Sequence, residues 1–248
     1  MNPETAVSIH GYAGDVGQIK FMWPYYLHHR CPVLVMSPED SPITLRDLPG
    51  NFGRADVKCL QGGVRAYVGE PSLIRQRIHM ELLLQTPFQW FLMNDSDSVC
   101  LSPQLPDYLY SEPSVVWSNV VSDEMHPRED GYEFPRLAFQ PPYFLHRTAM
   151  EKLVQAAPTV AVNPRTPFID WCMMSWCVKA GLPYRGFPDG CSCPTNNYPP
   201  GIECMTDAVR NRGATMLHAI KRREELLIMA GARVHYKRTH PQATRLFR

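Results

Sequence analysis

An alternation of short apolar runs with helical segments constrains the fold of this chain more than any other feature. The apolar runs occupy residues 6–10, 32–36, 89–93 and 114–117, and helical patterns occupy residues 16–27 and 71–85. Strands alternating with helices predict an α/β domain with a mostly parallel sheet and helices on both faces. Ligands of such sheets bind beyond the carboxyl ends of the strands. Residues 10–15, 37–40 and 94–98 are therefore the first candidates for a site, and a glycine-rich loop is expected before the second helix.

The length of 248 residues suits one large α/β domain, and 24 prolines indicate much ordered loop. No apolar run approaches the roughly 20 residues that span a bilayer. Residues 1–6 lack the layout of a secretory signal, so we expect a cytoplasmic protein with no membrane span. Reduced thiols are the expected state of the eight cysteines. Zinc is the minority alternative, at a group formed by Cys172, Cys177, Cys191, Cys193 and Cys204.

Two carboxylates follow the third apolar run, in the sequence Asp95-Ser96-Asp97. Acids two residues apart, just past a buried strand, can turn toward one cation. Their hard oxygen ligands suit Mg²⁺ or Mn²⁺, which in turn can hold a diphosphate. The alternative is a turn that only closes the strand.

The chain resembles the GT-A glycosyltransferases, which carry such an Asp-x-Asp motif at the end of a strand midway through a nucleotide-binding domain. Residues 7–12 resemble the first strand and the base-contacting loop of that family, and residues 33–40 its second strand and nucleoside-binding acid. The resemblance covers most of residues 6–221 and implies a Rossmann-type mixed sheet in a single domain. It assigns donor binding to His10, Gly11, Tyr12, Asp40, Asp95 and Ser96.

Three further residues are assigned roles by the same resemblance. Residues 168–171 resemble the segment that places a catalytic carboxylate at the acceptor, although only Asp170 matches because Ile169 replaces the first acid. Asp170 would act as the base that removes the acceptor proton, and the cap of a following helix is its alternative role. His218 lies in a segment that resembles the one supplying a third metal ligand beside Asp95 and Asp97, and Lys221 could add positive charge at the diphosphate.

The helix at residues 71–85 offers basic side chains to a nucleotide. Its period predicts that Ile74, Ile78 and Leu82 form the inward stripe. Arg77 falls in or beside this stripe, four residues before Glu81, and either pairs with that glutamate or reaches the nucleotide. Arg75 is a second candidate for nucleotide binding. His79 is expected at the surface.

The formal charge of +1 hides two opposite segments. Residues 208–248 hold 10 Lys and Arg against 2 Asp and Glu, a charge of +8, and residues 1–207 carry −7. So basic a segment favours a polyanion, and Arg222, Arg223, Lys237 and Arg238 are the candidate nucleic-acid contacts. Viral GT-A-like enzymes that glycosylate hydroxymethylated pyrimidines in DNA are the relevant resemblance, with loops 135–143 and 191–200 available to hold an extruded base. A solvated basic face is the alternative.

These observations predict a glycosyltransferase domain over residues 1–221, with a basic tail at residues 222–248 packed on it. The enzyme would use Mn²⁺ or Mg²⁺ and a nucleotide-diphosphate sugar, with a UDP-sugar favoured, and hydroxymethylated DNA is the favoured acceptor. A saccharide, a protein or a small molecule is the alternative acceptor. A nucleotidyltransferase and a non-catalytic nucleic-acid-binding protein are the alternative functions.

Overall fold

The computed structural model describes residues 4–28, 31–50, 56–66, 69–100, 105, 107–120, 139–159, 169–187, 192–194 and 216–218. The predicted nucleic-acid contacts, Lys221 and the whole of the predicted tail at residues 222–248 lie outside these ranges. Asp170 and His218 fall within them, but only their backbone is described.

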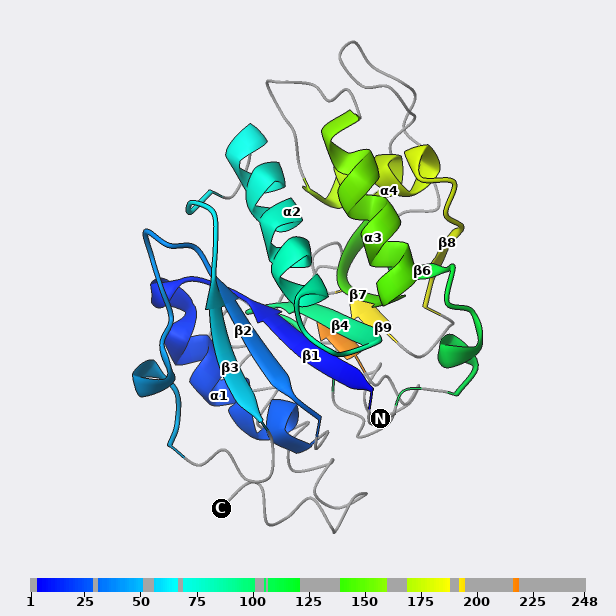
Figure 1. Cartoon of the computed structure of the whole chain (residues 1–248). Helices are drawn as coiled ribbons and strands as arrows, with labels where there is room; N and C mark the ends of the chain where they lie inside the picture. The colour runs from blue at the N-terminus through cyan, green and yellow to red at the C-terminus, as the bar shows by residue number, and fades with distance from the viewer. Residues whose placement is uncertain are drawn as a thin grey trace.

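Within the described ranges, seven strands form one sheet in the order β3-β2-β1-β4-β7-β6-β8 (Figure 1). These strands are β1 (Thr5–His10), β2 (Val33–Ser37), β3 (Val57–Gln61), β4 (Trp90–Asp95), β6 (Val116–Val120), β7 (Phe139–His146) and β8 (Tyr184–Gly186). All are parallel except β7, which runs antiparallel to its neighbours β4 and β6. The predicted mostly parallel sheet is confirmed.

A smaller sheet joins three short strands from distant parts of the chain. It contains β5 (Val99–Cys100), β10 (Met216–His218) and β9 (Ser192–Pro194), in that order. Strand β10 is antiparallel to β5 and parallel to β9. Because β5 follows β4 closely in sequence, this sheet lies beside the carboxyl end of β4.

Helices cover both faces of the large sheet, as predicted. The α-helices are α1 (Val16–His28), α2 (Glu70–Leu84), α3 (Arg147–Ala156) and α4 (Ile169–Lys179), and the short 3₁₀ helices are η1 (Ala13–Asp15), η2 (Leu45–Asp47), η3 (Asp107–Ser111) and η4 (Ala157–Thr159). Figure 1 shows α2, α3 and α4 together on one face and α1 on the other. None of the described helices has the length and apolar character needed to cross a bilayer.

The alternation of side chains along the strands supplies apolar surface to both faces. In β1, Ala6 packs into the core beneath α2, α3 and α4, whereas Val7 and Ile9 point to the opposite face. All six residues of β1 are buried. A strand buried on both faces explains why the sequence shows no charged residue there, and why Ser8 and His10 are buried beside apolar side chains.

Segments predicted as loops contain strands: residues 191–200, predicted to hold an extruded base, include β9 of the smaller sheet, and two other segments contribute strands to the large sheet. The predicted glycine-rich loop contains β3, and residues 139–143, predicted as a loop that could hold a base, belong to the internal strand β7. In β7, two prolines hide the strand pattern in the sequence. In the pairing of β6 with β7, Ser118 faces Tyr143 but Asn119 faces Gln140, so Pro141 and Pro142 lie in an irregularity of the ladder. Proline has no N–H to donate and is tolerated at such a bulge.

Helix α2 presents a different face to the core from the one predicted. Ile74 is 43% exposed, and Ile78 and Leu82 are only half-buried. The buried residues are instead Ser72, Leu73, Gln76, His79, Met80 and Leu83. Because three of these are polar, a search for an apolar stripe misplaces the inward face.

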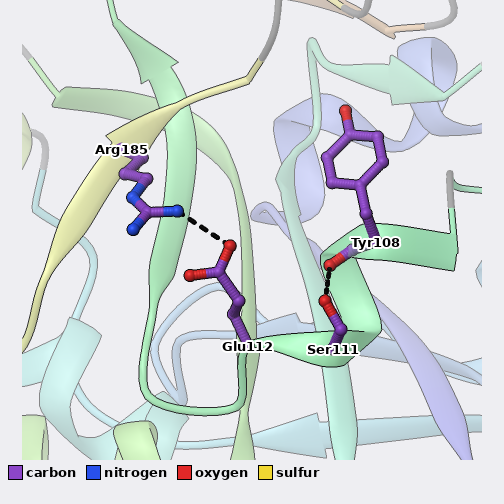
Figure 2. Close-up of polar contacts among 4 residues, drawn as sticks. All are labelled: Tyr108, Ser111, Glu112 and Arg185. Atoms are coloured by element: carbon purple, nitrogen blue, oxygen red, sulfur yellow. Dashed lines mark hydrogen bonds and ion pairs between the residues drawn. The ribbon is translucent and has the colours of Figure 1, made fainter.

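An ion pair joins the edge strand β8 to the residue after η3, and a second polar contact lies within η3. Figure 2 shows the Arg185 guanidinium donating to the Glu112 carboxylate at 2.8 Å, and the Ser111 hydroxyl donating to the carbonyl of Tyr108 at 2.6 Å. Both charged side chains are substantially exposed. Such a pair aligns the edge of the sheet and adds little to its stability.

The described cysteine side chains are reduced thiols, as predicted. Cys31, Cys172 and Cys177 are buried and Cys59 is half-buried. Burial raises the pKa of Cys31 to about 12 and that of Cys59 to about 11, so these thiols stay protonated at neutral pH. The side chains of Cys191, Cys193 and Cys204 lie outside the described part, and the zinc alternative stays a prediction.

Candidate functional site

A cavity of about 380 Å³ opens at the carboxyl ends of β1 and β4. Its walls come from the loop after β1, the turn after β4 and the middle of α2. Its described lining comprises His10, Gly11, Tyr12, Asp15, Gln18, Arg75, Gln76, His79, Asp95, Ser96 and Asp97. The cavity therefore lies where parallel sheets bind ligands.

Seven residues predicted from the sequence line this one cavity. They are His10, Gly11, Tyr12, Arg75, Asp95, Ser96 and Asp97. Asp40 and Arg77 are not among its lining residues. Of the other lining residues, Gln18, Gln76 and His79 were not predicted, and Asp15 fell within the candidate range 10–15 without an assigned role.

The two strand ends meet closely in this cavity. His10 is the register partner of Asp95, and the Ser96 amide donates to the His10 carbonyl at 2.8 Å. Gly11 occupies the contact between the two segments. A Cβ atom on Gly11 would lie 3.1 Å from the Asp15 carboxylate and 3.2 Å from the Ser96 Cβ. The close approach therefore favours glycine, because a Cβ atom here would force these neighbours to shift by a few tenths of an ångström.

Asp15 joins the loop after β1 to the turn after β4. Its carboxylate accepts a hydrogen bond from the Tyr12 amide at 3.1 Å and another from the Ser96 hydroxyl. Burial raises the pKa of Asp15, these two hydrogen bonds oppose the shift, and the nearby Asp97 charge adds to it. The sequence holds a weak signal for this residue, an acid in the short turn before α1.

A buried pair of histidines forms the wall beneath α2. His79 Nε2 lies 3.1 Å from the Gly62 carbonyl, which can only accept, so this nitrogen carries the proton. His79 Nδ1 therefore accepts from His10 Nδ1 at 3.1 Å, and His10 Nε2 accepts from the Ser8 hydroxyl at 3.1 Å. The chain of hydrogen bonds assigns one tautomer to each ring.

Both histidines are held neutral. Burial lowers the pKa of His79 to about 4, and the charge of Arg75 adds to this shift. For His10, burial, His79 and Arg75 place the pKa well below its usual value. The prediction that His79 lies at the surface is wrong, since the side chain is 1% exposed. Nothing in the sequence around His79 indicates its burial, because its partner His10 on β1 lies 69 residues away.

The two arginines of α2 have different environments. Arg75 lines the cavity. Arg77 makes the predicted pair with Glu81, with Arg77 Nε 3.4 Å from the carboxylate, on a partly exposed surface of the helix. Of the two candidates, Arg75 is the one placed to meet a ligand in this cavity.

Asp40 acts on the cavity through another residue. Its carboxylate accepts from the backbone amide of Arg65 at 2.7 Å. The Arg65 guanidinium lies over the ring of Tyr12, 4.0 Å from the ring centre. A cation over an aromatic face is an attractive arrangement, so Asp40 helps to hold Arg65 against a lining residue.

The residues present fit a divalent cation at the turn after β4. Asp95 and Asp97 bring carboxylate oxygens to the cavity. No group of three metal-binding side chains occurs among those described. The predicted third ligand, His218, ends strand β10, in which Leu217 faces Val99 of β5. Continuing this antiparallel register by one residue sets the backbone of His218 opposite Ser98, next to Asp97.

The remaining predicted residues are placed by their backbone alone or lie outside the described ranges. Helix α4 begins at Ile169, so Asp170 lies in its first turn and does not precede the helix as a cap would. Lys221, Arg222, Arg223, Lys237 and Arg238 fall outside the described part.

Comparison with known protein families gives no match, and no curated protein matches the chain.

Proposed function

We propose that this chain is a metal-dependent glycosyltransferase of the GT-A type that uses a nucleotide-diphosphate sugar. One observation carries the proposal: the cavity at the ends of β1 and β4 gathers Asp95, Asp97, Arg75 and Tyr12 from three separate segments. Two carboxylates, a guanidinium and an aromatic ring are the groups that a cation, a diphosphate and a nucleobase would require.

The charge of the cavity supports dependence on a metal. Its described lining carries three carboxylates, on Asp15, Asp95 and Asp97, against the one guanidinium of Arg75, while both histidines are neutral. Carboxylates at this density repel a diphosphate. Bound by Asp95, Asp97 and His218, a divalent cation would reverse that repulsion and supply a Lewis acid to the departing diphosphate.

The chain's own residues divide the remaining work. Arg75 would donate hydrogen bonds to phosphate oxygens. Tyr12, supported by Arg65 and Asp40, would border the nucleoside. Asp170 would remove the proton from the acceptor hydroxyl as the oxygen attacks the sugar carbon and the nucleoside diphosphate leaves.

Ligand-induced thermal stabilisation tests the donor site. We expect Mn²⁺ and UDP together to raise the melting temperature by several degrees, since ligand at 100 times its Kd adds about 2.7 kcal/mol. Asp97→Asn, which keeps the shape but removes the charge, should abolish the shift. Asp107→Asn, at an exposed aspartate of η3 away from the cavity, is the matched control and should keep it. No shift in the wild type with any nucleoside diphosphate would contradict the proposal.

The products distinguish the reaction from its alternatives. A glycosyltransferase releases a nucleoside diphosphate from a nucleotide sugar, whereas a nucleotidyltransferase releases pyrophosphate from a nucleoside triphosphate. The proposed acceptor is hydroxymethylated DNA, on the basis of the +8 charge of residues 208–248. Transfer of labelled sugar to hydroxymethylated but not to plain DNA would support this acceptor, and transfer to neither would remove it.

A further inference from the structure

The carboxylate of Asp15 bridges the two halves of the cavity. It accepts from the amide of Tyr12, in the loop after β1, and from the hydroxyl of Ser96, in the turn after β4. In the proposed function the first segment borders the nucleoside and the second carries the metal ligands. Asp15 itself is assigned to neither group.

The contact around Asp15 leaves little freedom for the two segments to move separately. The Ser96 amide is bonded to the His10 carbonyl at 2.8 Å, and the Asp15 amide to the Tyr12 carbonyl at 2.8 Å. At Gly11, even one added methyl group would come within 3.1 Å of the Asp15 carboxylate. A displacement of the turn after β4 would therefore be transmitted to the loop after β1.

The charges around Asp15 also favour the bridge between the two segments once a cation is bound. Its carboxylate is repelled by Asp97 and attracted by Arg65, which lies over the Tyr12 ring. A cation held at Asp95 and Asp97 would relieve this repulsion and strengthen the hold of Asp15 on both segments.

We propose that Asp15 is a positioning residue that couples binding of the divalent cation at Asp95 and Asp97 to binding of the nucleotide at Gly11 and Tyr12. The inference rests on the proposed function. A metal-loaded turn draws Ser96 and Asp15 into place, and Asp15 then fixes the Tyr12 amide and the loop that borders the nucleoside. Coupling of this kind is reciprocal, so the nucleotide must tighten metal binding by the same factor.

Calorimetric titration measures the coupling directly. The Kd for uridine, which lacks the phosphates that the cation itself would contact, is determined without metal and at saturating Mn²⁺, and the ratio of the two constants is the coupling factor. We expect a factor of about 10 or more in the wild type, within the usual range of such couplings. In Asp15→Asn it should fall to about 2, because the amide lacks the charge, while the Kd for Mn²⁺ alone changes less than about 3-fold.

Asp47 provides the matched control. In η2 its carboxylate accepts from the amide and the hydroxyl of Thr44, three residues earlier, as Asp15 accepts from the amide of Tyr12. Asp47 is not among the residues that line the cavity. Asp47→Asn removes an equivalent turn contact, and it should leave the coupling factor unchanged.

A second variant and a second readout cover a folding defect in Asp15→Asn. Ser96→Ala removes one of the two hydrogen bonds to Asp15 and should lower the coupling factor to an intermediate value. Hydrogen exchange reports the same link without nucleotide: Mn²⁺ alone should slow exchange of the Tyr12 amide in the wild type and not in Asp15→Asn.

The outcomes separate the two proposals. A coupling factor that is equal in the wild type and in folded Asp15→Asn would overturn the role of Asp15 and leave the proposed function intact. An equal loss in Asp47→Asn would also overturn it, because any weakened turn would then act alike. A wild type that binds neither Mn²⁺ nor UDP would overturn the proposed function, and the coupling with it.

Discussion

The buried histidine pair predicts a specific loss of stability in mild acid. His79 is neutral in the folded protein because its pKa is about 4, whereas in the unfolded chain it takes up a proton near its usual value of 6.5. The unfolded state therefore binds more protons between these two values, and lowering the pH through this window favours unfolding. The contribution of His79 to the free energy of unfolding is fully present above about pH 6.5 and is lost progressively as the pH falls toward 4.

The magnitude follows from the difference between the two pKa values. Each pKa unit corresponds to about 1.36 kcal/mol, so the contribution lost between pH 7 and pH 4 is about 3 kcal/mol. The hydrogen-bond geometry gives a structural reason for a value of this size. A second proton on His79 would fall on Nδ1, which faces the N–H of His10 at 3.1 Å.

Urea unfolding at a series of pH values, followed by tryptophan fluorescence, measures this loss. The variant His79→Gln keeps a side-chain donor for the Gly62 carbonyl but does not titrate. The difference between wild type and variant cancels the titrating groups that do not interact with His79; His10, whose pKa His79 lowers, is the exception. We expect the stability of His79→Gln relative to wild type to improve by about 3 kcal/mol between pH 7 and pH 4. Parallel pH profiles for the two proteins would refute the reasoning.

Three substitutions test other parts of the structure by urea unfolding. Gly11→Ala should lower the free energy of unfolding by about 1–2 kcal/mol through overpacking, and it should weaken binding of UDP with Mn²⁺. Gly17→Ala is the control and should not destabilise the protein, because the space around its Cβ is open. Equal losses in the two variants would contradict the close approach at Gly11. Arg147→Lys should lower the free energy of unfolding by about 2 kcal/mol, because the guanidinium donates to the carbonyls of Leu84, Thr86 and Phe88. An unchanged free energy of unfolding would show that lysine can replace these three hydrogen bonds. Glu112→Ala should change stability by less than about 1 kcal/mol because its pair with Arg185 is exposed, and a larger loss would contradict a weak surface contact.

Part of the candidate site follows from local patterns. The apolar runs that become β1 and β4 predict buried parallel strands, and residues following parallel strands lie at one edge of the sheet. His10, Gly11 and the Asp95–Asp97 turn therefore meet in the cavity as predicted. This inference needs the order of strands and helices but no packing detail.

Other parts of the site depend on the rotation of α2 about its axis. Residues 75 and 77 lie on different sides of a helix, so a small error in choosing the inward face exchanges one arginine for another. The inward face includes Gln76 and His79, whose burial is possible because His79 has partners on β1 and at Gly62. Partners 69 and 17 residues away in sequence leave no local trace.

The sequence by itself determined the α/β class, the mostly parallel sheet and the strand ends that meet, because periodicity and strand polarity are local properties. Only the tertiary structure decided which face of α2 is buried, that β7 is an internal antiparallel strand, and that Asp15 joins Tyr12 to Ser96. It also paired strand β10, which ends at His218, with β5, which begins two residues after Asp97. Each of these depends on contacts between segments far apart in the chain, and their free energies appear only when the segments pack.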